Sequence, residues 1–500
     1  MRKILLSSLV FTTAVLSLQG TVRSDSPNAQ VPKGSSKTGL DSALFNFNLI
    51  VPQPESVNEM YSAAWEVMSS KQDATFVDLM QDEVFQQHVE ANGLEVLGGP
   101  MLGSVTADGA KVWLRTLKPS RVEVQVDVGD QTKVYGPVQS TVESDLTAIV
   151  PVDGLQAGTR YPYRVLVDGQ VISIPKHAAI VTAPEDKSTG EVRIAFGSCL
   201  HRWGFGNQIH LDLIRSRNPS AMLLLGDIAV QDRENHLGLH RADYFMRDLY
   251  PAWQDFSATV PTYATWDDHD YFDNDKAGVY GAFTVADKAA VCDVFQQAWN
   301  NPSYGFNDQR RGVFLRTRIG PADVIMVDNR YFREKKKGDG AFLGDEQMDW
   351  LEAQLLDCKG PFIILSCGSM WSDYVSGGKD SWGKFDPKGR ERIFQLIEKH
   401  QIPGVILISG DRHGARGFTI PRPSGYEFYE FEAASLGGRC GPPTQHSSWK
   451  TQLYGICDQY AFGELSIDAN LADPEITFRL VEESGDIIYQ TTLTRSQLTP

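Results

Sequence analysis

The 500-residue sequence lacks the features of several common functional classes. Its formal net charge is −16, and its lysines and arginines concentrate only in the short "REKKKGDG" at Arg333–Gly340. A nucleic-acid-binding surface is therefore not expected, because the phosphate backbone is bound mainly through clustered Lys and Arg. The sequence also lacks the G-x-x-x-x-G-K-[ST] loop of nucleotide hydrolases and the H-E-x-x-H motif of zinc proteases.

A long apolar segment is missing as well. The apolar run Ile4–Leu18 follows Arg2 and Lys3, and it is shorter than the roughly 20 residues that a membrane-spanning helix needs. A positive start followed by such a run is typical of an export signal. We therefore expect residues 1–24 to be a signal peptide, no stable membrane span, and a periplasmic or secreted protein.

Cysteine is scarce, with six residues in the chain. Cys440 and Cys457 bracket a loop containing Gly, Pro and Ser, and in an exported protein they are the expected disulfide. A cysteine phosphatase is excluded at Cys199, because the arginine required six residues after the nucleophile is replaced by Phe205.

The chain divides into regions with different patterns. After a leader, residues 25–97 contain a helical segment in which Ser56 and Glu59 predict a capping box, and a second helix is expected over Phe76–Val89. Residues 98–184 show short alternating strands and turns, which predict a small immunoglobulin- or fibronectin-like β-sandwich. Residues 185–500 alternate apolar strands with helical stretches, which predicts a layered domain and an α+β multi-domain chain.

Metal-competent side chains follow several of the predicted strands. Polar residues placed after strands collect at one edge of a layered sheet, where open α/β folds bind ligands. A single Asp after a strand is explained by turn chemistry alone, but a succession of such strand ends predicts a site. The residues concerned are Cys199, Asp227, Asp268, His269, Asp411 and His413.

These residue types suit a pair of metal ions. Clustered Asp227, Asp268 and Asp411 would repel one another without cations, and their oxygen ligands favour Ca²⁺, Mg²⁺ or Mn²⁺. Cys199 and His413 favour iron or zinc, and Asp227 is the expected bridging ligand. Two such ions activate a shared water and clamp the attacking and leaving oxygens of a phosphoryl displacement.

Neighbouring residues add further candidates. His269 is the expected catalytic group, which protonates the leaving oxygen or stabilises charge in the transition state. Arg330 is expected to bind phosphate oxygens, and Arg412 is a weaker candidate for the same contact. Asp267 and Asp270 are expected to hold the turn and to orient His269.

The acidic stretch "WDDHDYFDND" was also tested against a calcium loop. An EF-hand that begins at Asp273 has Asp275 and Gly278 in register, but position 12 is Thr284 instead of Glu. The calcium-loop interpretation therefore fails, and either a solvated turn or one wall of a metal site remains.

From Gly98 to the C-terminus the sequence resembles the PhoD-like (alkaline phosphatase D) family of the calcineurin-like metallophosphoesterase superfamily. The resemblance rests on an ordered set of segments, "GGPMLGSVTADGAKVWLRT", "FGSC", "LLLGD", "WDDHD", "MVDNR", "LGDEQMDWLEAQL" and "LISGDRHG". It implies a four-layer α/β/β/α sandwich after an immunoglobulin-like domain. It also implies an iron–calcium centre, with zinc, manganese or magnesium as other possible metals, acting on phosphomonoesters and diesters.

The sequence departs from the family pattern at one candidate ligand. Val230 stands where the family often has a tyrosine that binds iron, and Asp232 is an alternative ligand there. The expected function is an exported phosphatase or phosphodiesterase acting on small-molecule phosphate esters. The alternatives are a catalytically degenerate extracellular binding protein and a phospholipid headgroup hydrolase, and the oligomeric state is left open.

Overall fold

The computed structural model describes residues 39–185, 191–307, 311–334, 341–373, 381–433, 435–438 and 444–500. The expected signal peptide lies outside the described residues, and so does Cys440, the expected disulfide partner of Cys457. Among the described residues, no helix combines the length and the apolar character needed to cross a bilayer.

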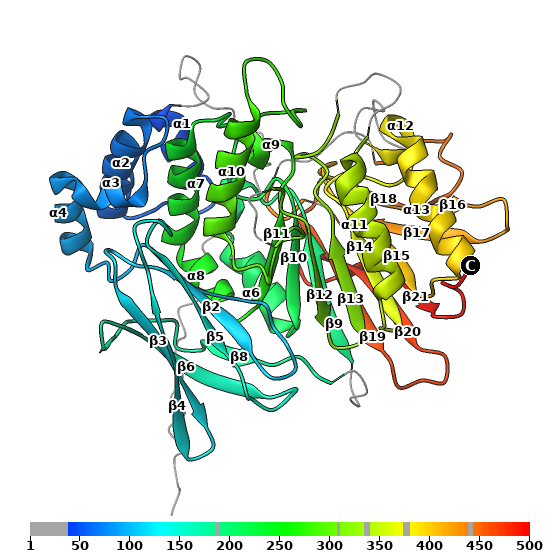
Figure 1. The fold of residues 1–500 in the computed structure, drawn as a ribbon, viewed down its shortest axis with the longest axis horizontal. Helices are drawn as coiled ribbons and strands as arrows, with labels where there is room; N and C mark the ends of the chain where they lie inside the picture. Colours follow the sequence, from blue (N-terminus) through cyan, green and yellow to red (C-terminus); the bar gives the residue numbers. More distant parts are fainter. Residues whose placement is uncertain are drawn as a thin grey trace, which may run out of the picture.

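Two β-sheets packed face to face form the centre of the molecule (Figure 1). The first has the strand order β11-β10-β9-β19-β20-β21 and the second β12-β13-β14-β15-β17-β16-β18. The strands of the first sheet are β9 (Val192–Gly197), β10 (Ala221–Leu225), β11 (Thr262–Thr265), β19 (Ala461–Asp468), β20 (Glu475–Glu482) and β21 (Ile487–Thr494). The strands of the second sheet are β12 (Leu315–Ile319), β13 (Ala322–Met326), β14 (Phe362–Ser366), β15 (Val405–Ser409), β16 (Ala415–Pro421), β17 (Glu427–Glu432) and β18 (Gln452–Ile456).

The alternation of side chains along β10 explains why its sequence is apolar throughout. Leu223 and Leu225 point into the core between the two sheets, whereas Met222 and Leu224 point to the opposite face, which helices cover. Because both faces of the strand are buried, neither position tolerates a polar residue. The apolar runs predicted as strands at β9, β10, β11, β13, β14 and β15 are all strands in the structure.

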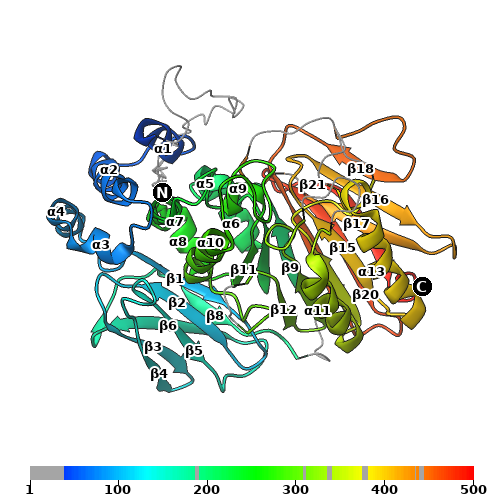
Figure 2. The ribbon, with the colours of Figure 1, turned by 45° about the horizontal axis from the view of Figure 1, so that its top comes forward.

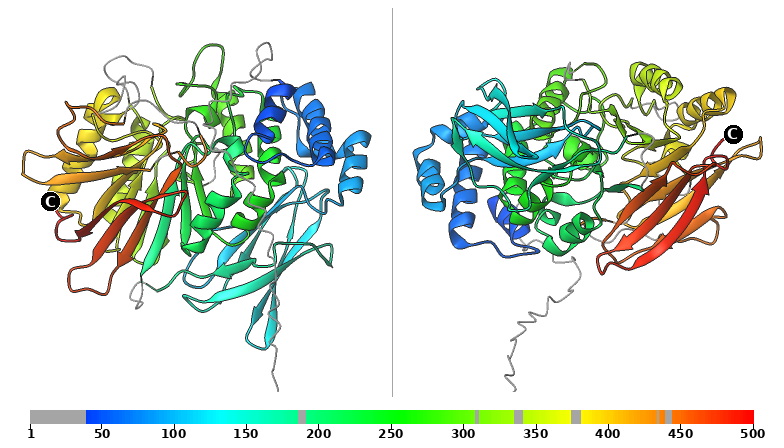
Figure 3. Two further views of the ribbon diagram at one scale, coloured as in Figure 1. Left: turned by 180° about the vertical axis from the view of Figure 1, so that it is seen from behind. Right: turned by 90° about the horizontal axis from the view of Figure 1, so that it is seen from below.

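Helices cover the outer faces of both sheets and complete four layers (Figure 3). On the first sheet lie α6 (Gln208–Ser216), α7 (Leu237–Leu249), α8 (Pro251–Ser257) and α10 (Val285–Ala298), and on the second α11 (Gly344–Asp357) and α13 (Pro387–His400). Short helical turns accompany them, namely α5 (His201–Gly204), α9 (Asp268–Tyr271) and α12 (Trp382–Phe385). The predicted four-layer order is therefore present.

The region before the layered domain contains a small β-sandwich (Figure 2). Its sheets have the orders β1-β2-β5 and β4-β3-β6-β7, with β8 paired to β6. The strands are β1 (Gly98–Gly103), β2 (Ala110–Arg115), β3 (Arg121–Val128), β4 (Gln131–Gln139), β5 (Thr147–Val152), β6 (Arg160–Val167), β7 (Gln170–Val171) and β8 (Ala179–Val181). The two-sheet arrangement agrees with the prediction, whereas the likeness to an immunoglobulin domain stays a prediction.

Four helices precede the sandwich and pack along α7 (Figure 1). They are α1 (Leu40–Phe47), α2 (Glu55–Ser70), α3 (Phe76–Gln81) and α4 (Glu83–Asn92). The predicted capping box at Ser56 is wrong, because α2 begins at Glu55 after Pro54 and has no side-chain cap. The single helix predicted over Phe76–Val89 is two helices, because the Asp82 carboxylate accepts the Phe85 N–H and starts α4.

Asp145 joins the N-terminal helices, the β-sandwich and the layered domain. Its buried carboxylate accepts the backbone N–H of Phe76 at 2.9 Å and contacts Arg241 of α7 at 2.7 Å and Arg115 of β2 at 3.1 Å. Each partner belongs to a different part of the chain, so this one side chain ties three parts together.

We predict that Asp145→Ala lowers the free energy of unfolding by about 3–5 kcal/mol, because it leaves two buried guanidinium groups uncompensated. Urea denaturation of the full chain, with Asp153→Ala as the solvent-exposed control, measures the change. A loss no larger than that of the control would contradict this assignment.

Candidate metal centre

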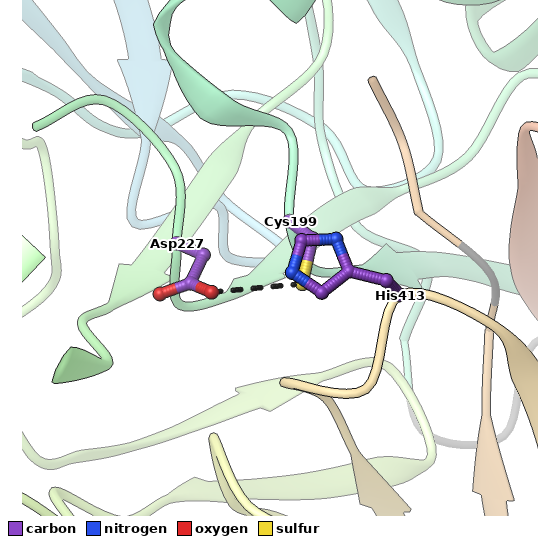
Figure 4. Close-up of side chains that lie close together, drawn as sticks. All are labelled: Cys199, Asp227 and His413. Carbon is purple, nitrogen blue, oxygen red and sulfur yellow. Dashed lines mark hydrogen bonds between the residues drawn. The ribbon is translucent and has the colours of Figure 1, made fainter. Parts of the chain in front are cut away.

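Strand ends from both sheets bring the predicted ligands together. Residue groups with ligand atoms within 4.8 Å of one another are Cys199–Asp227–His413, Asp227–Asp268–His269 and Asp227–Asp267–Asp268–Asp411. Figure 4 shows the first group, in which Cys199 Sγ lies 3.7 Å from Asp227 Oδ2. Asp227 belongs to all three groups, which is the position expected of a bridging ligand.

The donor set fits metal binding. Asp227 is 1% exposed, and its Oδ1 has no hydrogen-bond partner among the described residues. Buried polar atoms are almost always paired, so a buried carboxylate oxygen in this state points to a ligand. Asp227 shares one group with the Cys199 thiol and the His413 imidazole, and the other groups with the remaining carboxylates and His269.

The backbone at the strand ends adopts unusual conformations. Cys199, Asp227, Asp411 and His413 have φ values of +53°, +54°, +80° and +56°. Left-handed conformations at residues other than glycine cost of order 1–3 kcal/mol each and concentrate at functional sites. These four residues are all among the predicted metal ligands, so the strained backbone coincides with the site.

Burial and mutual repulsion raise the pKa values of the central groups. Burial, and after it the charge of Asp227, raises the pKa of the Cys199 thiol well above its usual value. Burial together with Asp268 and Asp267 raises the pKa of Asp227 likewise. A positive charge among these groups is therefore required to keep them ionised.

Arg330 supplies one such positive charge. Its guanidinium is fully buried, donates from Nε to Asp267 Oδ1, and holds Nη2 3.6 Å from Asp268 Oδ1. Asn329 donates to the same Asp267 oxygen at 2.9 Å. Arg412 lies at the other end of the cluster, with Nη1 3.4 Å from Asp411 Oδ2. Contact of either arginine with phosphate oxygens stays a prediction.

His269 is held by Asp232. Its Nδ1 lies 2.6 Å from Asp232 Oδ1, so the expected orientation of His269 by Asp267 or Asp270 is replaced by a contact with Asp232. Burial lowers the pKa of His269, but Asp227 and the bond to Asp232 outweigh it and raise the pKa to about 11. In the described part of the chain, Asp232 belongs to none of the three ligand groups.

Comparisons with known proteins find matches to both the layered domain and the β-sandwich. The profile described as PhoD-like phosphatase matches residues 195–470, more than half of the chain. The chain belongs to the PhoD-like phosphatase family. A second profile, a domain of unknown function (DUF7800), matches residues 94–184, which contain the β-sandwich.

Individual relatives of this PhoD-like phosphatase are distant. Alkaline phosphatase D of Bacillus subtilis (strain 168) is 22% identical over 230 residues, which cover 40% of this chain and only 37% of that protein. The solved "Structure of PhoD" superimposes with a TM-score of 0.65 at 15% identity and covers 81% of this chain and 91% of that one. Purple acid phosphatase PPD1 from yellow lupin superimposes with a TM-score of 0.58 at 14% identity, over 79% and 74% of the two chains. The structural likeness establishes the shared fold.

The family's tyrosine position has a structural role in this chain. The Val230 side chain is fully buried in the apolar core, and its backbone N–H donates to Asp270 Oδ1 at 3.1 Å. Asp270 also accepts the N–H groups of Ile228 and Ala229. Asp270 therefore holds the loop after Asp227, and its contact with the Asp267 N–H in a capping box holds the predicted turn as well.

Sequence reasoning missed several residues around the centre. Gln231 and Ser369 carry no motif that distinguishes them, and Asn329 lies in the "MVDNR" segment but was not singled out. His201 has one signal, because it stands two residues after Cys199, and His413 stands two residues after Asp411. Its ring stacks on that of His413 with centroids 5.3 Å apart.

We predict that Asp270→Ala lowers the free energy of unfolding by roughly 2–5 kcal/mol, because it leaves three buried N–H groups without an acceptor. Asp270→Asn, which keeps one acceptor oxygen, is expected to lose less. Urea denaturation with Asp273→Ala as the matched control measures both effects. Equal stability of the alanine and wild-type proteins would show that the loop is held by other contacts.

Proposed function

We propose that this chain is an exported, metal-dependent phosphatase or phosphodiesterase that hydrolyses phosphate mono- and diesters at a two-metal centre. The observation that carries the proposal is the convergence of one thiol, two imidazoles and three further carboxylates on the buried Asp227. Membership of the PhoD-like phosphatase family supports the same chemistry. The acidic net charge of −16 disfavours nucleic acid and supports small phosphate esters as substrates.

Asp227 is shared between a group that contains Cys199 and His413 and a group that contains Asp268 and Asp411, which favours two different metals. Cys199 and His413 would hold iron or zinc, and Asp268 and Asp411 would hold calcium, manganese or magnesium, with Asp227 shared. We favour the iron–calcium pair. When bound, the pair supplies a water of lowered pKa and a positive charge for the phosphoryl oxygens.

The protein's own groups have separate roles in the proposed reaction. Asp232 accepts from His269 Nδ1, which leaves Nε2 as the nitrogen that donates a proton to the leaving oxygen. Arg330 balances the charge of Asp267 and Asp268. We propose that Arg412, whose Nη1 lies 3.4 Å from Asp411 Oδ2, contacts phosphate oxygens.

A second candidate function is phosphate-ester binding without turnover by a degenerate phosphoesterase fold. The burial of Val230 favours it, because the apolar side chain at that position offers no metal ligand. The intact carboxylate cluster weighs against it. Tight binding of inorganic phosphate with no hydrolysis under any metal supplement would support this second candidate.

The proposal predicts two bound metals in the purified protein and their loss on mutation. Asp227→Ala is expected to lose both metals, because it removes the shared ligand, and His413→Ala to lose one. Hydrolysis of aryl phosphate mono- and diesters should fall by at least about 10³-fold in both. Metal analysis by mass spectrometry with parallel rate measurements tests this.

The exposed Asp130→Ala is the matched control for these variants. The proposed function would be ruled out if the purified wild-type protein held no metal and if Asp227→Ala and His413→Ala were as active as the wild type.

We predict that His269 contributes to the chemical step and not to metal binding. His269→Ala should retain the metals but lower kcat by about 10²–10⁴-fold, because proton donation to the leaving group is lost. The loss should be smaller for substrates whose leaving group needs no proton, such as nitrophenolate. A rate plot against leaving-group pKa for the two proteins measures this, and equal slopes would contradict the role.

A further inference from the structure

His201, absent from the predicted site, is part of a stack of three rings beside the metal centre. Its ring lies nearly parallel to that of Trp203, with centroids 4.8 Å apart at 16°, and to that of His413, at 5.3 Å and 17°. The residue is 4% exposed. The His413 ring therefore rests on a flat neighbour that is itself packed in place.

A hydrogen-bond chain fixes the edge of the His201 ring. His201 Nδ1 lies 2.8 Å from Gln231 Oε1, and Gln231 Nε2 donates to Asp232 Oδ2 at 3.4 Å. The other oxygen of Asp232 bonds His269 Nδ1. One carboxylate thus connects the two histidines, His269 directly and His201 through a single glutamine.

The Asp232 carboxylate determines which atom donates in each hydrogen bond of this series. An ionised carboxylate only accepts, so both His269 Nδ1 and Gln231 Nε2 must donate to Asp232. Gln231 Nε2 and His269 Nδ1 lie 3.0 Å apart, so these two donors share the Asp232 carboxylate as their acceptor. Gln231 then presents its oxygen to His201, whose Nδ1 must carry a proton.

Gln231 is anchored at its backbone as well. Its N–H donates to Asp243 Oδ2 at 3.2 Å, and the fully buried Asp243 also binds Arg202 at 2.9 Å and Arg233 at 2.7 Å. A buried carboxylate with two guanidinium partners cannot shift without leaving charges unpaired. The glutamine that holds His201 is therefore fixed by a rigid network.

We propose that His201 is a positioning residue for His413, and that Gln231 holds His201 in place. A metal–imidazole bond requires the metal to lie near the ring plane, so a contact that sets this plane sets the direction of the donor nitrogen. The nearly parallel His201 ring, with its centroid 5.3 Å from that of His413, is such a contact. The inference rests on the proposed function, in which His413 is a metal ligand.

Titration of the metal-free full-length protein with Co²⁺ tests this, because the visible bands of Co²⁺ report ligand geometry and a competing chelator gives the affinity. His201→Ala is expected to weaken Co²⁺ binding about 10–100-fold and to shift the bands. Gln231→Ala should weaken it by roughly 3–10-fold, and His201→Phe, which keeps a flat ring, by less than about 3-fold.

His400→Ala is the matched control, because His400 is exposed at the end of α13. If His201→Ala and Gln231→Ala both fold and keep the wild-type affinity and spectrum, the inference is overturned and the proposed function is not affected. If His201→Ala does not fold, the inference is overturned by wild-type affinity and spectrum in folded Gln231→Ala, or by a loss in folded His201→Phe as large as the one expected for His201→Ala. A wild-type protein that binds no Co²⁺ would overturn the proposed function together with the inference.

Discussion

The centre depends on how one electrostatic repulsion is balanced, namely that among the carboxylates of Asp227, Asp267, Asp268 and Asp411. Four carboxylates within 4.8 Å of one another and largely out of water raise the free energy of the folded chain unless positive charge lies among them. Arg330 provides part of that charge from behind Asp267. The remaining negative charge is what makes the cluster a cation site, and the thiol and imidazole beside it extend the site to softer metals.

The scaffold holds these groups together against that repulsion through backbone contacts. The Cys199 N–H donates to Gly226 O at 3.1 Å and the His201 N–H to Asp227 O at 2.9 Å, so the ends of β9 and β10 bind each other. Asp270 holds the following loop through three N–H groups. The predicted ligands are therefore presented by a pre-organised edge, and metal binding would not need to order it.

Much of the architecture and of the centre could be predicted from the sequence. Apolar runs that are buried on both faces give a strong signal, and the parallel strands β9, β10 and β11 place their ends at one edge. Contacts between residues far apart in the chain gave no signal. Asp232 and His269 are 37 positions apart, and Arg330 and Asp267 are 63 apart. Strand β4 is hard to predict from the sequence, because its side chains are mostly exposed and it lacks a clear apolar alternation.

The packing of α1–α4 against α7 has a practical consequence. The segment before Leu94 has no counterpart in either matched profile, and a protein trimmed to the matched regions would omit it. Phe245 of α7 meets Phe76 and Phe85, and Tyr250 meets Phe47. Such trimming would expose these rings as one contiguous apolar patch, and aggregation of the shortened protein would follow even with every metal ligand intact.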